Sequence, residues 1–377
     1  MKLLLCPDKY KGSLDSEQLG AALAEGARLA LPEAAVVSLP LADGGDGTEA
    51  VLRRQLGGTE QSVRVADPLG RPVQAGYTLL GEGHTAVIEM ARASGLALLA
   101  PSARDALRAD TYGTGELMRH ALAQGARRLL LCIGGSATTD GGAGMARALG
   151  YRLLDAEGED LPPGGAALAR LERIAAPQPD PLAGIEVEVA CDVDNPLLGP
   201  RGAARVYAPQ KGASEAEVAQ LERGLERLAQ VWAEMGHAVA ERPGAGAAGG
   251  LGAGLIAFAR ARLRSGIELV MHELDFEAQV RQADLILTGE GRLDGQTFSG
   301  KVIHGVCQVA RRHGVPVAAL CGAIDLSPDQ QQEMGLSLAL SVLPAPCSLE
   351  QAMHQARPWV VQSAFSVVKL FYEARVG

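Results

Sequence analysis

The chain begins and ends with the same alternation of apolar, strand-like runs and helical patterns. Six short apolar runs occur toward the two ends, at residues 2–7, 35–41, 62–66, 283–288, 315–321 and 338–343. Helical periodicity separates several of them, for example over 16–31 and 300–313. A β-α-β order is typical of a parallel sheet with right-handed crossovers. We therefore predict a six-stranded, doubly wound, Rossmann-like α/β domain built from both chain ends.

The middle of the chain mixes strand-like and helical patterns without this regular alternation. A long amphipathic helix is predicted over 215–235. The glycine- and alanine-rich segment 244–254 leads directly into an apolar helical pattern, which favours an ordered loop over a flexible linker. The predicted domains are a discontinuous Rossmann-like domain of residues 1–68 and 281–377, and an inserted mixed α/β domain of residues 69–280.

Composition excludes several classes of protein. The 377 residues are 47% hydrophobic and 21% charged, which favours a buried core over disorder. A net charge of −9 and an aromatic content of 3% disfavour a nucleic-acid interface. The six cysteines form no CxxC pair, and no apolar run is long enough to span a membrane. We expect a cytoplasmic protein with a small-molecule substrate and no nucleic-acid or membrane partner; a homodimer stays open.

Two glycine-dense loops carry the chemistry expected of a phosphate site. The first, over 134–142, follows an apolar run and combines backbone amides with hydroxyl groups ahead of a helical pattern. A simple helix cap is the alternative, but one hydroxyl group would be enough for that. The predicted nucleotide contacts in this loop are Gly134, Gly135, Ser136, Thr138 and Thr139.

The second loop, over 289–301, contains the spacing of a Walker A motif in residues 295–301. Val302 stands where that motif places the Ser or Thr that binds magnesium, so a true P-loop is disfavoured. We favour a different phosphate-binding loop with a lysine as point charge, and a glycine-rich turn with an exposed lysine is the alternative. Its predicted nucleotide contacts are Gly289, Glu290, Gly300 and Lys301.

Carboxylates follow two other apolar runs. Asp43 and Asp46 lie in a glycine turn, and Asp192 and Asp194 precede an Asn-Pro turn. Magnesium bound by one or two carboxylates and phosphate oxygens suits this pattern better than calcium, which needs more oxygen ligands. We predict Asp43, Asp46 and Asp194 as metal ligands and Asp192 as the general base. The structural alternative for Asp43 and Asp46 is a turn that caps the helix predicted from Thr48. For Asp192 and Asp194 it is a turn built on Asp-Asn-Pro.

Cations complete the predicted site. Lys9 and Lys11 follow the first apolar run, and Arg292 lies in the second glycine loop. These three side chains are predicted to neutralise an acidic substrate and the transferred phosphoryl group; solvated surface cations are the alternative. Because ligands of doubly wound sheets bind at the carboxyl ends of the strands, we expect all these loops to meet in one cleft between the two domains.

Five segments together closely resemble the bacterial glycerate kinase family of the glyoxylate and glucarate pathways. They are residues 6–13, 41–48, 134–142, 191–197 and 289–301, and the resemblance runs from about residue 2 to 375. It implies ATP-dependent phosphorylation of D-glycerate with magnesium, at the 2-hydroxyl in preference to the 3-hydroxyl. It also implies a Rossmann-like domain from both chain ends with an inserted α/β domain.

Two other functions are weighed against this kinase. A nucleotide-dependent dehydrogenase would need GxGxxG after the first strand, where the chain has the segment 8–12 with a single glycine. A non-catalytic nucleotide or sugar-acid binding protein on the same fold would not need the predicted base. The sequence therefore favours the enzyme over both.

Overall fold

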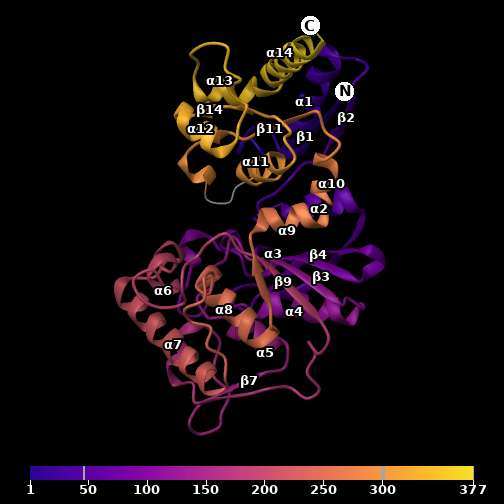
Figure 1. Cartoon of the computed structure of the whole chain (residues 1–377). Coiled ribbons are helices and arrows are strands. Elements are labelled where there is room, and N and C mark those ends of the chain that lie inside the picture. Colours follow the sequence, from indigo (N-terminus) through magenta and orange to yellow (C-terminus); the bar gives the residue numbers. More distant parts are fainter. Residues whose placement is uncertain (46, 299–301, 377) are drawn as a thin grey trace. The chain divides into compact units, whose positions relative to one another are not determined.

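The computed structural model describes residues 1–45, 47–298 and 302–376, and it is an α/β protein (Figure 1). The chain divides into two compact units. The terminal unit comprises Met1–Asp43 and Ile267–Gly377, and the inserted unit comprises Gly44–Gly266. None of the helices in the described ranges combines the length and the apolar character needed to cross a membrane.

The terminal unit contains a five-stranded parallel sheet made from both chain ends, which confirms the predicted Rossmann-like arrangement. The strand order is β15 (Leu338–Ser341), β13 (Val317–Cys321), β11 (Leu285–Gly289), β1 (Lys2–Pro7) and β2 (Ala35–Ser38). The central strands β11 and β13 are buried along their whole length, as in sheets that helices cover on both faces.

Helices cover both faces of this sheet. Leu3 and Leu5 of β1 pack in one apolar cluster with α1 (Ser16–Ala30) and α14 (Ala356–Val376), which lie side by side (Figure 1). α11 (Val302–Arg312) contacts β11 and β13. The other helices of the unit are α9 (Gly266–Glu273), α10 (Phe276–Val280), α12 (Pro328–Met334) and α13 (Leu349–His354).

The inserted unit has its own six-stranded mixed sheet. The strand order is β10 (Arg262–Arg264), β9 (Glu186–Ala190), β6 (Arg128–Cys132), β5 (Thr85–Glu89), β4 (Pro72–Leu80) and β3 (Gly58–Ala66). β10, β9, β6 and β5 are parallel, whereas β4 is antiparallel to both of its neighbours. Two short pairs complete the strands: β7 (Arg152–Leu154) with β8 (Arg173–Ala175), and β12 (Arg292–Leu293) with β14 (Ala323–Ile324) in the terminal unit.

The prediction that the terminal sheet has a sixth strand was wrong. Residues 62–66 do form a strand, but they are part of β3, which pairs along its whole length with β4 in a hairpin of the inserted unit. Alternation along a strand indicates its exposed and buried faces but not its partner. The boundaries of the compact units, at 43/44 and 266/267, accordingly differ from the predicted domain boundaries at 68/69 and 280/281.

The core of the inserted unit includes the fully buried Trp232. Trp232 lies on α7 and makes an edge-to-face contact with Phe258, at 5.4 Å between ring centroids. The helices are α2 (Thr48–Leu56), α3 (Ala91–Ser94), α4 (Tyr112–Ala123), α5 (Ala143–Ala148), α6 (Ala203–Tyr207), α7 (Glu215–Glu234) and α8 (Ala247–Ala259). A capping box of Ser214 and Glu217 begins α7, close to its predicted start.

The close contact between α1 and α14 gives a test of the terminal unit. A Cβ atom on Gly26 would clash with the Val361 carbonyl and lie 2.8 Å from the Ala364 Cβ. Without that contact, Gly26→Ala would stabilise the helix by about 1 kcal/mol. We expect it instead to destabilise the protein by about 1–3 kcal/mol, measured by urea unfolding. Leu29→Ala, at a 62% exposed position of the same helix, is the control with little expected effect. A stabilised Gly26→Ala protein would contradict the packing.

Candidate active site

Three of the predicted loops leave the terminal sheet at one edge. Pro7, the last residue of β1, pairs with Gly289, the last residue of β11. The Asp8 amide donates to the Gly289 carbonyl at 3.1 Å, and the Leu41 amide donates to the Pro7 carbonyl at 3.1 Å. The segment that leads to Asp43 therefore passes the same strand end. In a parallel α/β sheet this carboxyl edge is the usual place for a ligand.

The second glycine loop lies next to the segment that carries the predicted lysines. A Cβ atom on Gly291 would lie 3.6 Å from the Lys11 backbone nitrogen, so the backbones of these two loops are neighbours. The Lys9 and Lys11 side chains are exposed at this edge. Arg292, which follows Gly291, is 64% exposed and forms an ion pair with Asp325 at 2.8 Å. This ion pair raises the pKa of Arg292. The Arg292 guanidinium therefore already has a carboxylate partner at the surface.

The Glu290 side chain is buried, whereas a nucleotide contact is expected to be exposed. It is 6% exposed, and its carboxylate accepts a hydrogen bond from the fully buried Thr297 hydroxyl at 2.7 Å. The Thr297 amide donates to the Asp294 carbonyl at 2.9 Å. Glu290 therefore holds the loop from inside. The predicted residues Gly300, Lys301 and Asp46 lie outside the described residues.

In the inserted unit, the glycine turn after Asp43 lies over the carboxyl edge of the sheet. A Cβ atom on Gly44 would lie 2.7 Å from the Cβ of Ala190, the last residue of β9. A Cβ atom on Gly134 would lie 3.6 Å from the Gly45 Cα. The turn therefore lies close to two of the strand ends from which predicted site loops begin, and a side chain at Gly44 would clash with the end of β9.

Glu89, which the sequence analysis missed, anchors this turn. It ends β5, is 6% exposed, and accepts the amides of Gly47 at 2.9 Å and Glu49 at 3.0 Å through one carboxylate oxygen. Burial raises the pKa of Glu89, while the amide donors and Arg92 act in the opposite direction. A carboxylate at the end of an apolar strand was the only available signal in the sequence.

Asp192 lies beside the same turn. Its carboxylate accepts the Gly266 amide at 2.8 Å, and the Gly266 Cα would lie 2.8 Å from a Cβ atom on Gly44. Asp194 has another partner, the exposed Arg201 at 2.7 Å, and this ion pair lowers its pKa. β9 ends at Ala190, so Asp192 and Asp194 both lie beyond the strand, in the loop that follows it.

The loop 134–142 is exposed only at its start. Gly134 and Gly135 are exposed and Ser136 is half-buried, whereas Thr138 and Thr139 are fully buried. The hydroxyl oxygens of Thr138 and Thr139 have no hydrogen-bond partner among the described residues. Backbone amides and the Ser136 hydroxyl are therefore what this loop presents at the surface, and its two threonine hydroxyls face the interior.

A buried lysine that the sequence analysis missed holds this loop. Lys211 is 2% exposed, and its Nζ donates to the Ser136 Oγ at 2.8 Å and to the Thr138 carbonyl at 2.5 Å. Burial lowers the pKa of Lys211 to about 7, and Asp140 acts in the opposite direction. No motif surrounds this lysine, which ends a short 3₁₀ turn over Pro209–Lys211, so sequence patterns could not identify it.

Asp140 fixes the end of the loop. Its fully buried carboxylate accepts the Thr111 amide at 2.9 Å, the Thr111 hydroxyl at 2.8 Å and the Gly144 amide at 2.9 Å. The neighbouring Asp110 is 5% exposed, and burial together with Asp140 raises its pKa to about 7. Buried polar contacts therefore set the position of residues 134–136, at the start of this loop.

Each of the two sheet edges, taken by itself, presents groups that suit phosphate binding or proton transfer. Lysines and glycine amides can bind phosphate oxygens, and Asp192 can accept a proton. Within residues 1–45, 47–298 and 302–376, no group of three or more His, Cys, Asp or Glu side chains is arranged to hold a metal ion. A magnesium ion bound by one or two carboxylates and completed by phosphate oxygens is compatible with that finding.

Comparisons with known proteins agree over the whole chain. A model of the glycerate kinase family matches residues 3–372. The chain is 45% identical to a glycerate kinase of Halalkalibacterium halodurans, with 97% of each chain covered. It is 43% identical to a glycerate 2-kinase of Escherichia coli, with 94% of each covered. A crystal structure from Salmonella typhimurium LT2, described as a candidate glycerate kinase 2, superposes with a TM-score of 0.91 at 42% identity and covers both chains completely.

The buried position of Lys211 predicts a pH dependence of stability. Its pKa is about 7 in the folded protein against an ordinary value of 10.5. Between these values the unfolded state holds a proton that the folded state lacks, so stability rises with pH by at most about 1.4 kcal/mol per pH unit. Below pH 7 this contribution to the slope disappears.

We expect urea unfolding from pH 7 to 10 to show wild type gaining stability relative to Lys211→Met as the pH rises. The control is Lys369→Met, at an exposed lysine whose ion pair with Glu373 raises its pKa, and it should keep a constant difference from wild type over this range. A constant difference for Lys211→Met as well would show that Lys211 is charged in the folded protein.

Proposed function

The chain belongs to the glycerate kinase family, and we propose that it transfers the γ-phosphoryl group of ATP to the 2-hydroxyl of D-glycerate. Membership makes it a phosphotransferase with ATP as a substrate. The choice of the 2-hydroxyl is supported by the E. coli relative, which is named a glycerate 2-kinase. The position of Asp192 is the observation that carries the proposed mechanism.

We propose that Asp192 is the general base. Its carboxylate follows a parallel strand, is exposed, and lies beside the glycine turn through their common neighbour Gly266. The Gly266 amide orients the carboxylate through one oxygen. A base of this kind accepts the proton of the attacking hydroxyl group, as an aspartate does in protein kinases.

The remaining groups would bind and neutralise phosphate. The exposed Gly134 and Gly135 have no side chain to keep phosphate oxygens from the backbone, and the half-buried Ser136 adds a hydroxyl group. Lys9 and Lys11 would neutralise the glycerate carboxylate and the phosphoryl group. Phosphoryl transfer depends mainly on such positioning and charge stabilisation, because the reacting groups need little covalent help.

Magnesium, when bound, would neutralise charge on the phosphate oxygens. We assign it to Asp43 and, from the sequence pattern alone, to Asp46. Asp194 is a weaker candidate than these two, because it would first have to leave its ion pair with Arg201. Arg292 is likewise held by Asp325, so we give it a smaller role than Lys9 and Lys11.

The role of Asp192 can be tested by Asp192→Asn, which keeps the shape but cannot take the proton. We expect kcat to fall by about 10²–10⁴-fold, the usual contribution of a general base. The affinity for ATP, measured by calorimetry, should change less than about threefold. Asp160→Asn, which removes an exposed carboxylate paired with Arg152, is the matched control and should resemble wild type. Turnover close to wild type in Asp192→Asn would remove Asp192 from the mechanism.

The reaction itself can be tested by phosphorus NMR of the product. We expect ATP turnover that depends on D-glycerate and a single product, 2-phosphoglycerate. Formation of 3-phosphoglycerate would contradict the proposed regiochemistry while leaving the kinase intact. ATP binding without glycerate-dependent turnover would instead support the non-catalytic binding protein.

A further inference from the structure

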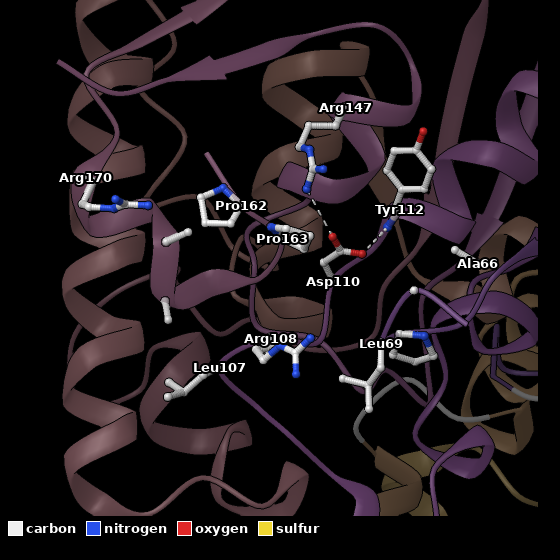
Figure 2. Close-up of a pocket in the computed structure, with 14 residues that line it drawn as sticks. Ala66, Leu69, Leu107, Arg108, Asp110, Tyr112, Arg147, Pro162, Pro163 and Arg170 are labelled. Atoms are coloured by element: carbon white, nitrogen blue, oxygen red, sulfur yellow. Dashed lines mark hydrogen bonds and ion pairs between the residues drawn. The ribbon is translucent and has the colours of Figure 1, made fainter. Parts of the chain in front are cut away.

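The inserted unit contains a pocket of about 630 Å³ that includes none of the proposed active-site residues (Figure 2). It lies between the turn after β3, the segment before α4, α5 and the chain over 162–170. Leu69, Leu107, Pro162 and Pro163 contribute apolar surface. A pocket with largely apolar walls and a few polar groups is the usual form of a small-molecule site.

The charged groups that line this pocket are mostly positive. They are the three arginines Arg108, Arg147 and Arg170 and one carboxyl group, that of Asp110. Such an excess of cations is unusual for a chain with a net charge of −9. The exposed Arg108 and Arg170 side chains have no hydrogen-bond or ion-pair partner in the described part of the chain. Their guanidinium groups are therefore available to an anion.

Arg147 and Asp110 form an ordered floor for the pocket. The Asp110 carboxylate accepts the Tyr112 amide at 3.0 Å and contacts the Arg147 guanidinium at 3.5 Å, as Figure 2 shows. The Arg147 guanidinium also lies over the Tyr112 ring, at 5.7 Å from its centroid. These contacts hold Arg147 in one orientation, which lowers the entropic cost of binding an anion.

The buried contacts continue from this floor to the exposed loop of the proposed active site. Asp110 adjoins Asp140, which accepts the Thr111 and Gly144 amides. The carboxylate of Asp140 interacts electrostatically with Lys211, whose Nζ donates a hydrogen bond to the Ser136 Oγ. Buried polar groups therefore connect the pocket to the loop 134–136, although none of the lining residues belongs to that loop.

We propose that this pocket is a second ligand site, for a small dianion that carries an apolar group. The three arginines would bind a phosphate monoester or a dicarboxylate, and the leucine and proline side chains would cover the apolar part. The site goes beyond the proposed kinase reaction and does not depend on it, because neither Arg108 nor Arg170 has a role in that reaction.

Calorimetric titration with three probes tests the site. Phenyl phosphate and phenylsuccinate represent the two sources of the dianion, and inorganic phosphate lacks the apolar group. We expect at least one phenyl probe to bind wild type about tenfold or more tightly than inorganic phosphate does. No binding by either phenyl probe, or equal binding of inorganic phosphate, would overturn the proposal.

The decisive variant is Arg108→Ala/Arg170→Ala, which removes two exposed side chains. We expect binding of the phenyl probe to weaken at least about tenfold, because charge-assisted hydrogen bonds are lost. The charge-matched control Arg173→Ala/Arg223→Ala removes two exposed arginines outside the pocket and should bind as wild type does. Equal weakening in both double variants would mean a general charge effect and would overturn the site.

Glycerate kinetics separate this proposal from the kinase proposal. We expect kcat and the KM for D-glycerate in Arg108→Ala/Arg170→Ala to stay within about twofold of wild type, since the pocket is a second site. A large rise in the KM for D-glycerate would show that the pocket is the acceptor site and would overturn a separate ligand. Wild type without turnover would contradict only the kinase proposal, because probe binding is measured independently.

Discussion

The parallel pairing of β1 with β11 is the interaction on which the terminal unit depends. It joins Leu3 to Leu285 and so connects the beginning of the chain to its last third. Both strands are largely buried, and a buried strand without neighbours would leave its amides and carbonyls unpaired. Neither chain end can therefore form this sheet alone. The same pairing brings the loops of Lys9 and Glu290 to one edge of the sheet. It therefore fixes where the two loops that carry predicted phosphate-binding groups begin.

The inserted unit positions its surface loop in another way, through polar groups buried beneath it. Asp140 accepts backbone amides from two segments, and Lys211 donates to Ser136 and Thr138. A buried charge is stable only when its partners satisfy it, so these side chains tolerate few arrangements of the surrounding backbone. The exposed Gly134 and Gly135 and the half-buried Ser136 are therefore positioned by the buried groups beneath them.

Apolar runs made the parallel sheet of the terminal unit and the loops at its edge predictable, because strand ends and glycine turns leave local signals in the sequence. The partner of residues 62–66 left no such signal, since alternation is the same whichever sheet a strand joins. Lys211 and Glu89 were missed for a related reason. Their importance comes from burial and from distant hydrogen bonds, and an isolated lysine or glutamate in the sequence resembles any solvated surface residue. The loop 134–142 does lie between an apolar strand and a helix, as the sequence indicated. The sequence did not show that the hydroxyl groups of the loop divide between surface and interior.

The discontinuity of the terminal unit has a consequence for biosynthesis. Residues 1–43 leave the ribosome before the rest of the terminal unit, yet the other three strands of their five-stranded sheet all lie after residue 284. Residues 44–266 contain every strand of their own sheet and can become compact while translation continues. The N-terminal strands must therefore wait, with apolar side chains exposed, until the last third of the polypeptide emerges, and a chaperone that shields them would act during that interval.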